Sequence, residues 1–272
     1  MAGWDDILRE LGDTPSQTDI VRRKYLKALS NYTGRNTIAY YSAFLTRSVA
    51  GTDINDSDMT GFMNALKGMD CSKGLDLILH TPGGSPAAAE AIVSYLRSKF
   101  HNDIRVIVPQ ISMSAGTMIA CAAKVIIMGK QSSLGPIDPQ FNGIPAYNIK
   151  AEFEEAKADL AVHPENAQYW AIKLQQYPAA FMKTALDAIE LSSNLITVWL
   201  GSCMYNSSIP EEKAIVENIV QQLNEHDRSK THGRHFNIDF CRDIGLKIEE
   251  MEKDNRLQDK ILSVVTFQFR FN

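Results

Sequence analysis

One serine and two glycine-rich turns have the residue types and spacing to catalyse acyl transfer. The first turn, Thr81–Ser85, reads Thr-Pro-Gly-Gly-Ser and follows the apolar run Leu75–His80. The second turn, Ile111–Thr117, carries Ser114 and follows the apolar run Ile104–Val108. Hydrolysis of an amide or ester by a serine needs a reachable hydroxyl, a base, and N–H donors aimed at the developing oxyanion. The two turns have the residues to supply the hydroxyl and the donors.

The two turns differ in what each could contribute. Because Gly83 and Gly84 lack a Cβ, their N–H groups can turn outward and a substrate backbone can come close. Ser114 precedes a helix that we expect to begin near Ala115, where free N–H groups and the helix dipole favour an oxyanion. Taken singly, each turn is better explained as a tight turn after a strand, with the serine as a helix cap. Together, about one β-α unit apart, they favour a catalytic site.

Strands and helices of an α/β fold must position these turns. The apolar runs have the length and β-branched content of buried parallel strands, and helix-forming runs follow them. This order predicts right-handed crossovers and helices that cover a parallel sheet. Ser85 and Pro86 suit the cap and the first position of a helix. The predicted strands are Thr37–Phe44, Leu75–Thr81, Ile104–Val108 and Val125–Met128, and the helices are Asn55–Leu66, Pro86–Phe100 and Ala115–Ala123.

The ends of the chain and its second half have a different character. Residues 1–33 read as a peripheral helical extension with Ser16 as its N-cap, and residues 34–272 as one domain with a helical C-terminal part. A polar, histidine-bearing loop is expected over Asn224–Asn237. The alternating apolar pattern of Leu262–Phe271 predicts a final strand, with a contact between subunits of an oligomer as the alternative. The helices predicted in between are Ile149–Val162, Asn166–Gln176, Ala179–Tyr205 and Pro210–Leu223.

Composition excludes several classes of protein. The 272 residues are 44% hydrophobic and 22% charged, enough for a full core, and the net charge of −4 argues against a nucleic-acid partner. No stretch is long and apolar enough for a membrane span, and the N-terminus lacks signal-peptide features, which predicts a cytoplasmic protein. Cysteine and histidine spacing, including His226, His232, His235 and Cys241, fits no metal site, so we expect neither a metal nor a cofactor.

Longer strings resemble a known family. Thr81–Gly84 is similar to the S-P-G-G turn of ClpP-type peptidases. Ser114–Gly116 is similar to their S-M-G and to the S-G-G of signal-peptide-peptidase-A-type Ser-Lys enzymes. The strings Ser112–Ala120 and Ser132–Gln140 resemble the serine dehydrogenase proteinase branch of the ClpP/crotonase superfamily. The similarity runs from about Thr37 to Leu262, and the string Leu-Gly-Pro-Ile-Asp-Pro-Gln identifies the branch.

The resemblance implies a ClpP/crotonase-like spiral of β-β-α units with added C-terminal helices. It also implies a homo-oligomer with an internal chamber, and metal-free hydrolysis of peptide bonds in peptides or unfolded proteins. It assigns Ser114 as the nucleophile, with Gly84 and Ala115 as oxyanion donors through their N–H groups. The chain has no P-loop, so energy-driven unfolding would need another protein.

Several residues are candidates for the general base. The position at which ClpP-type enzymes carry their catalytic histidine falls near Pro136, which cannot take up a proton. A desolvated lysine is the favoured replacement. Lys173 and Lys183 stand among apolar neighbours, although a solvated lysine on an amphipathic helix is the commoner case. Asp138 could orient a base, or could cap a turn between two prolines.

Histidines and a second serine complete the candidates. A histidine would need the least pKa tuning, but His80 beside the first turn is better explained by a structural hydrogen bond. His232 and His235 lie far along the chain, and the sequence leaves open whether they fold back. Ser112 is a rival nucleophile, but it lacks the small residue and glycine that follow Ser114.

The sequence therefore predicts a serine endopeptidase-like hydrolase whose favoured base is a lysine. Two other functions stay open. A crotonase-like acyl-coenzyme A enzyme would use the same two N–H groups to polarise a thioester. A catalytically decayed scaffold or binding protein would keep the fold without the chemistry, and Pro136 at the usual histidine position is the main argument for it.

Overall fold

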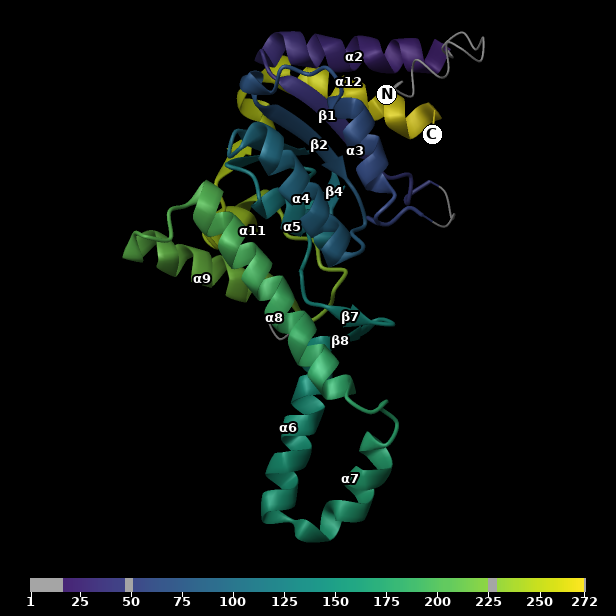
Figure 1. Ribbon diagram of the computed structural model, residues 1–272, viewed down its shortest axis with the longest axis vertical. Coiled ribbons are helices and arrows are strands. Elements are labelled where there is room, and N and C mark those ends of the chain that lie inside the picture. The colour runs from purple at the N-terminus through teal and green to yellow at the C-terminus, as the bar shows by residue number, and fades with distance from the viewer. Residues whose placement is uncertain (1–16, 47–50, 225–228, 272) are drawn as a thin grey trace.

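A parallel sheet of five strands forms the centre of the computed structural model, which describes residues 17–46, 51–224 and 229–271 (Figure 1). The strand order is β1-β2-β3-β5-β9, and every neighbouring pair is parallel. The α/β fold class is therefore confirmed. The strands are β1 (Asn36–Tyr41), β2 (Leu75–His80), β3 (Ile104–Val108), β5 (Val125–Met128) and β9 (Ile248–Glu250).

Two helices from opposite ends of the chain cover one face of the sheet. These are α2 (Gln17–Thr33) and α12 (Asn255–Phe271), which lie along the sheet at the top of Figure 1. The strand residues on this face align across the sheet, since Ile78 pairs with Ile107 and Ile107 with Ile127. The buried cluster between helices and sheet consists of Leu29, Ile78, Ile107, Ile127, Met251, Ile261, Val264 and Val265.

The predicted strand over Leu262–Phe271 is wrong, because this segment belongs to helix α12. Its apolar residues alternate, but Ile261, Val264 and Val265 also have the i, i+3, i+4 spacing of one helix face, and all three are buried. Packing against α2 and the sheet favours the helix over the strand.

The other face of the sheet carries the large core and most of the helices. Ser85 caps α4 as predicted, since its hydroxyl accepts a hydrogen bond from the Ala88 N–H at 3.2 Å. The helices on this side are α3 (Asp58–Leu66), α4 (Pro86–Phe100), α5 (Ala115–Cys121), α8 (Phe181–Trp199), α9 (Pro210–Asn224) and α11 (Ile238–Asp243). A π-helical turn, Leu200–Met204, follows α8, and 3₁₀ turns occur at Cys71–Lys73, Pro164–Asn166 and Met251–Lys253.

Two small sheets lie beyond the carboxyl ends of the main strands. In one, β4 (Ile111–Ser112) pairs in parallel with β6 (Ser133–Leu134). In the other, β7 (Gln140–Phe141) pairs antiparallel with β8 (Ile144–Pro145). Because parallel strands end at the same edge of a sheet, the segments after β2, β3 and β5 meet here.

A helical arm projects from this edge (Figure 1). It consists of α6 (Ala146–Val162), α7 (Ala167–Leu174) and the first turns of α8. A separate apolar cluster, built around Ala146, Ile149 and Ala185, joins α6 to α8. Residues 1–16 of the predicted N-terminal extension lie outside the described residues, so the division into two domains stays a prediction. Within residues 17–46, 51–224 and 229–271, no helix combines the length and apolar character that crossing a membrane requires.

Candidate active site

Ser114 stands at the sharp turn between β4 and α5. Its φ of 50° and ψ of −119° lie in a region that residues with a side chain rarely adopt. Its hydroxyl makes no hydrogen bond that caps α5, and the residue is partly exposed. Strain of this kind is stored at functional sites, and a serine at a strained strand-to-helix turn presents its Oγ to solvent. Helix capping therefore does not explain this serine.

The two glycine-rich turns touch each other. The Thr81 N–H donates to the Ile111 carbonyl at 3.1 Å, and the Met113 N–H donates to the Thr81 carbonyl at 3.0 Å. A Cβ added to Gly83 would lie 2.7 Å from the Ser114 Cβ. The first turn is thus packed directly against the residue that the sequence proposes as nucleophile.

Backbone N–H groups of both turns flank Ser114, but they differ in availability. The Gly83 N–H donates to the Thr81 hydroxyl at 3.1 Å. Within the described residues, the N–H groups of Gly84 and Ala115 have no hydrogen-bond acceptor. Of the three oxyanion donors proposed from the sequence, Gly84 and Ala115 are therefore the two that remain open to a ligand. The Gly83 donor instead fixes the conformation of the turn.

Ser112, the rival nucleophile, is fully buried. Its hydroxyl has no hydrogen-bond partner among the described residues, and a Cβ added to Gly116 would lie 2.6 Å from its Oγ. A hydroxyl packed this closely against the backbone of α5 has no path to a substrate carbonyl.

A three-stranded backbone ladder joins the Ser114 turn to two later segments. Ser112 pairs in parallel with Leu134, and Leu134 pairs antiparallel with Phe236. One residue further on, the Gly135 N–H donates to the Thr117 hydroxyl at 3.0 Å, and a Cβ on Gly135 would lie 2.5 Å from the end of the Met113 side chain. The segments around residues 135 and 236 are thereby fixed against the nucleophile turn.

The ladder brings Asp138 and His232 together. Asp138 lies four residues after Leu134 and His232 four residues before Phe236, so the bridge between Leu134 and Phe236 brings their two segments close together. The His232 Nδ1 is 2.7 Å from Asp138 Oδ1 across 94 residues of sequence. The carboxylate is fully buried, whereas 31% of the imidazole side chain is exposed. The sequence named both residues but gave no sign of the pairing, because no local pattern links Leu134 to Phe236.

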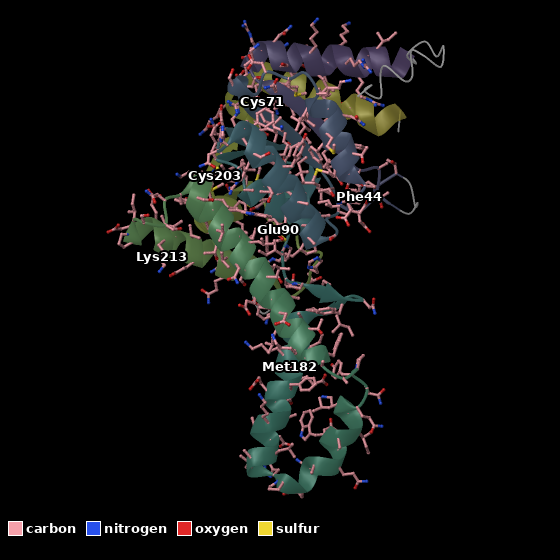
Figure 2. All side chains as sticks on the ribbon, in the orientation of Figure 1. Phe44, Cys71, Glu90, Met182, Cys203 and Lys213 are labelled. Atoms are coloured by element: carbon pink, nitrogen blue, oxygen red, sulfur yellow. The ribbon has the colours of Figure 1, made fainter. Side chains whose placement is uncertain are left out.

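The two candidate lysines lie in ion pairs on the helical arm. Lys173, on α7, is 2.7 Å from Glu152 and stacks on the Trp170 ring. Lys183 pairs with Asp187 on the exposed side of α8, and Figure 2 labels the adjacent Met182 at the base of the arm. The hydrogen bonds to Glu152 and Asp187 raise the pKa of Lys173 and of Lys183 respectively. Both ion pairs therefore favour the protonated form of the lysine.

Two further histidines near the ladder have structural partners. His80 is buried, with Nε2 3.2 Å from Gln110 Oε1 and its ring beside Tyr41, and burial lowers the pKa of its imidazole. The His235 Nδ1 lies 2.7 Å from the Ser133 hydroxyl. His226 lies outside the described residues. No group of three or more metal-ligating side chains occurs among the residues described.

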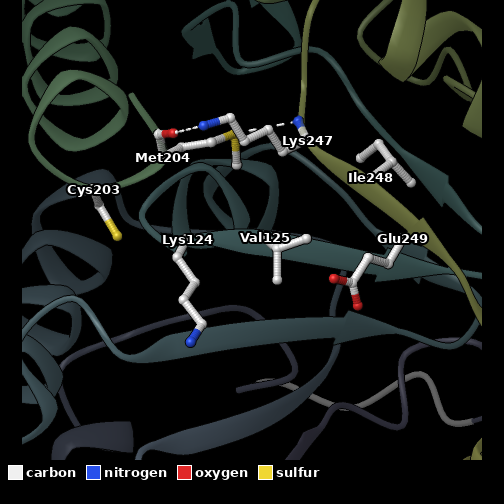
Figure 3. Close-up of a pocket in the computed structure, with 7 residues that line it drawn as sticks. All are labelled: Lys124, Val125, Cys203, Met204, Lys247, Ile248 and Glu249. Carbon is white, nitrogen blue, oxygen red and sulfur yellow. Dashed lines mark hydrogen bonds between the residues drawn. The ribbon is translucent and has the colours of Figure 1, made fainter. Parts of the chain in front are cut away.

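Figure 3 shows the residues that line an open cavity of about 630 Å³. It is lined by Lys124, Val125, Cys203, Met204, Lys247, Ile248 and Glu249. Val125 and Ile248 begin strands β5 and β9, so this cavity lies at the amino ends of the strands, away from the Ser114 turn.

The Gly84 position gives the first prediction. We expect Gly84→Ala to destabilise the fold by on the order of 1–3 kcal/mol, because φ is +148° and a Cβ would lie 2.4 Å from the Ile54 backbone N and O. Displacement of the Gly84 N–H should also slow reactions at Ser114 about 10²-fold. Urea unfolding and a serine-reactive probe measure the two effects.

The matched control is Gly61→Ala on helix α3. No atom lies within 4 Å of a Cβ there, so alanine should leave stability unchanged or slightly raised. Equal unfolding midpoints for the two variants would contradict the close approach of Gly84 to Ile54.

Fold and site together define an α/β protein with a serine at a strained turn beside open backbone donors. Residues 22–164, more than half of the chain, match the family described as ClpP-like SDH-type serine proteinase. The chain belongs to this family. The resemblance stated from the Ser132–Gln140 string is thereby confirmed.

Relatives and solved structures extend the comparison. An uncharacterized protein of Methanocaldococcus jannaschii is 36% identical over 149 residues, which cover 53% of this chain and 52% of that protein. A second uncharacterized protein of that organism is 45% identical over 75 residues, 28% of this chain and 25% of the other. The chain thus matches about half or less of the length of these relatives.

Among solved structures, two variants of the 1510-N membrane-bound stomatin-specific protease are similar, one of them in complex with a substrate peptide. The first has a TM-score of 0.35 and 16% identity, and the match covers 79% of this chain and 95% of that chain. The second has a TM-score of 0.32 and 17% identity, with coverages of 85% and 95%. At these scores the likeness supports no statement about the site.

Proposed function

We propose that this protein is a serine endopeptidase in which Ser114 attacks the scissile carbonyl of a peptide or unfolded protein. The observation that carries the proposal is the strained Ser114 turn between two N–H groups, of Gly84 and Ala115, that have no acceptor in the described chain. Such donors stabilise the negative oxygen that forms when a hydroxyl adds to a carbonyl. Membership of a serine proteinase family supports the same reaction.

We assign the general-base role to His232, oriented by Asp138. The 2.7 Å contact with the Asp138 carboxylate requires the proton of the neutral ring to sit on Nδ1, which leaves the Nε2 lone pair free. Nε2 would take the Ser114 hydroxyl proton during attack and return it to the leaving amine, while the buried carboxylate stabilises the imidazolium. Lys173 and Lys183, the bases favoured by the sequence, are less suited because each is already paired with a carboxylate.

Reaction with a fluorophosphonate tests the nucleophile without a known substrate. The Ser114 oxygen would attack phosphorus, its proton would pass to the base, and fluoride would leave. We expect one adduct per folded chain, located on Ser114 by mass spectrometry of peptides, and none on heat-denatured protein.

The location of the adduct separates the candidate functions. An adduct at Ser112 would move the nucleophile to that residue, and no adduct on correctly folded protein would rule out the peptidase proposal. Stabilisation of unlabelled protein by acyl-coenzyme A would then favour the crotonase-like function, and its absence the scaffold. A homo-oligomeric assembly and a cytoplasmic location stay predictions from the sequence.

A further inference from the structure

Asp138 is held from two sides. Its Oδ1 lies 2.7 Å from the His232 Nδ1, and its Oδ2 accepts a hydrogen bond from the Gln140 Nε2 at 2.7 Å. The Asp138 side chain is fully buried, so water does not replace either contact. The two oxygens of one carboxylate therefore serve different partners, and the Gln140 amide lies on the side away from the histidine.

The backbone of Gln140 is fixed independently of Asp138. Gln140 pairs with Pro145 in the β7–β8 hairpin, whose two-residue loop is Asn142-Gly143. The φ values of 51° and 82° at these residues are those of a type I′ turn, the connection that matches strand twist. The Ala146 N–H also donates to the Pro139 carbonyl at 2.8 Å. The amide of Gln140 thus projects from a rigid support at the base of the helical arm.

The Gln140 donor at Oδ2, together with the His232 contact at Oδ1, restrains rotation of the Asp138 carboxylate about its Cβ–Cγ bond. Fixing the plane of the carboxylate also fixes the direction of the His232 ring, because Nδ1 of the ring is hydrogen-bonded to one of the two carboxylate oxygens. A buried carboxylate oxygen without a donor is costly, and hydrogen bonds to charged groups are the stronger kind.

We propose that Gln140 is a positioning residue that aims His232 at Ser114 by holding the Asp138 carboxylate through Oδ2. This inference rests on the proposed function, in which His232 is the base. Gln140 touches no reacting atom and acts through Asp138. It also makes the β7–β8 hairpin, and with it the base of the arm, part of the support of the site.

The experiment compares Gln140→Leu and Gln140→Glu with the wild-type chain at pH 8. Glutamate keeps the length of the side chain but, when ionised, replaces the donor by an acceptor. Both variants should lower the second-order rate of Ser114 phosphonylation about 10-fold, the effect of one lost hydrogen bond to a charged group. The control Gln176→Leu changes an exposed glutamine near the end of α7 and should label at the wild-type rate.

A spectroscopic readout separates positioning from folding. The Nδ1 proton of His232, bonded to a carboxylate, should give a downfield proton NMR signal that is shifted or lost in both Gln140 variants. A wild-type rate and an unchanged signal in Gln140→Leu, which has no donor in any protonation state, would overturn the proposal. If His232→Ala labels as fast as wild type, the assignment of the base fails and the role of Gln140 with it. If His232→Ala is slow but both Gln140 variants are normal, only the role of Gln140 fails.

Discussion

Ser114→Ala should abolish fluorophosphonate labelling and lower peptide hydrolysis on the order of 10³-fold or more, because it removes the hydroxyl proposed as nucleophile at the strained turn that packs against Gly83. The fold should survive, since the Ser114 hydroxyl makes no cap hydrogen bond and alanine is the smaller residue. Labelling, hydrolysis of an unfolded protein, and thermal unfolding measure the three properties.

Ser112→Ala is the matched control, two residues away in the same turn. Its hydroxyl is buried and has no hydrogen-bond partner in the part of the chain that the structure describes, so its removal should leave both activity and stability close to wild type. Loss of labelling in Ser112→Ala with retention in Ser114→Ala would reverse the assignment of the nucleophile.

His232→Ala should lower the rate of Ser114 phosphonylation about 10²- to 10⁴-fold, the range typical of a lost general base. Asp138→Asn should act in the same direction, because an amide NH₂ turned toward Nδ1 favours the wrong tautomer of the ring. Rates are compared at one pH in folded protein, with circular dichroism as the check on folding.

Three substitutions serve as controls for the base. His235→Ala removes a nearby imidazole that contacts the Ser133 hydroxyl instead of Asp138, and it should label at nearly the wild-type rate. Lys173→Ala and Lys183→Ala should do the same, because their carboxylate partners raise the pKa of each lysine and hold it protonated. A slow Lys173 or Lys183 variant together with a normal His232→Ala would restore the lysine as base.

Much of the sheet, and the meeting of the glycine turn with Ser114, could be predicted from local patterns. The runs at 75–80 and 104–108 consist mostly of Leu, Ile and Val, a composition typical of buried parallel strands. Ser85-Pro86 marks a helix start that the structure confirms. The glycine pair and Ser114 could be paired in advance because consecutive parallel strands end at one edge of the sheet.

Elements that depend on distant contacts were missed or wrong. Strand β9 has only three residues, and its place beside β5 is not visible in its sequence. The sequence of the C-terminal helix α12 predicts a strand because its apolar residues fit both the two-residue period of a strand and the 3.6-residue period of a helix. Only the packing of α12 against α2 and the sheet decides between the two. The β7–β8 hairpin did carry a local signal, Asn142-Gly143, that the sequence reading overlooked.

The Asp138–His232 pair is a different case, since both residues were candidates and only their meeting was unknown. It depends on the antiparallel bridge between Leu134 and Phe236, which no periodicity encodes. The same bridge explains how a chain with Pro136 at the usual histidine position can still bring an imidazole to this edge of the sheet.

The backbone ladder through Ser112, Leu134 and Phe236 also bears on the order in which the chain is made. A ribosome delivers the serine and both N–H donors well before residue 232 leaves the exit tunnel. If His232 is the base, Ser114 of a nascent chain has no general base. Hydrolysis then becomes possible only when Phe236 pairs with Leu134 and brings His232 to Asp138. Synthesis itself would then protect the cell, and the unfinished chain, from premature cleavage.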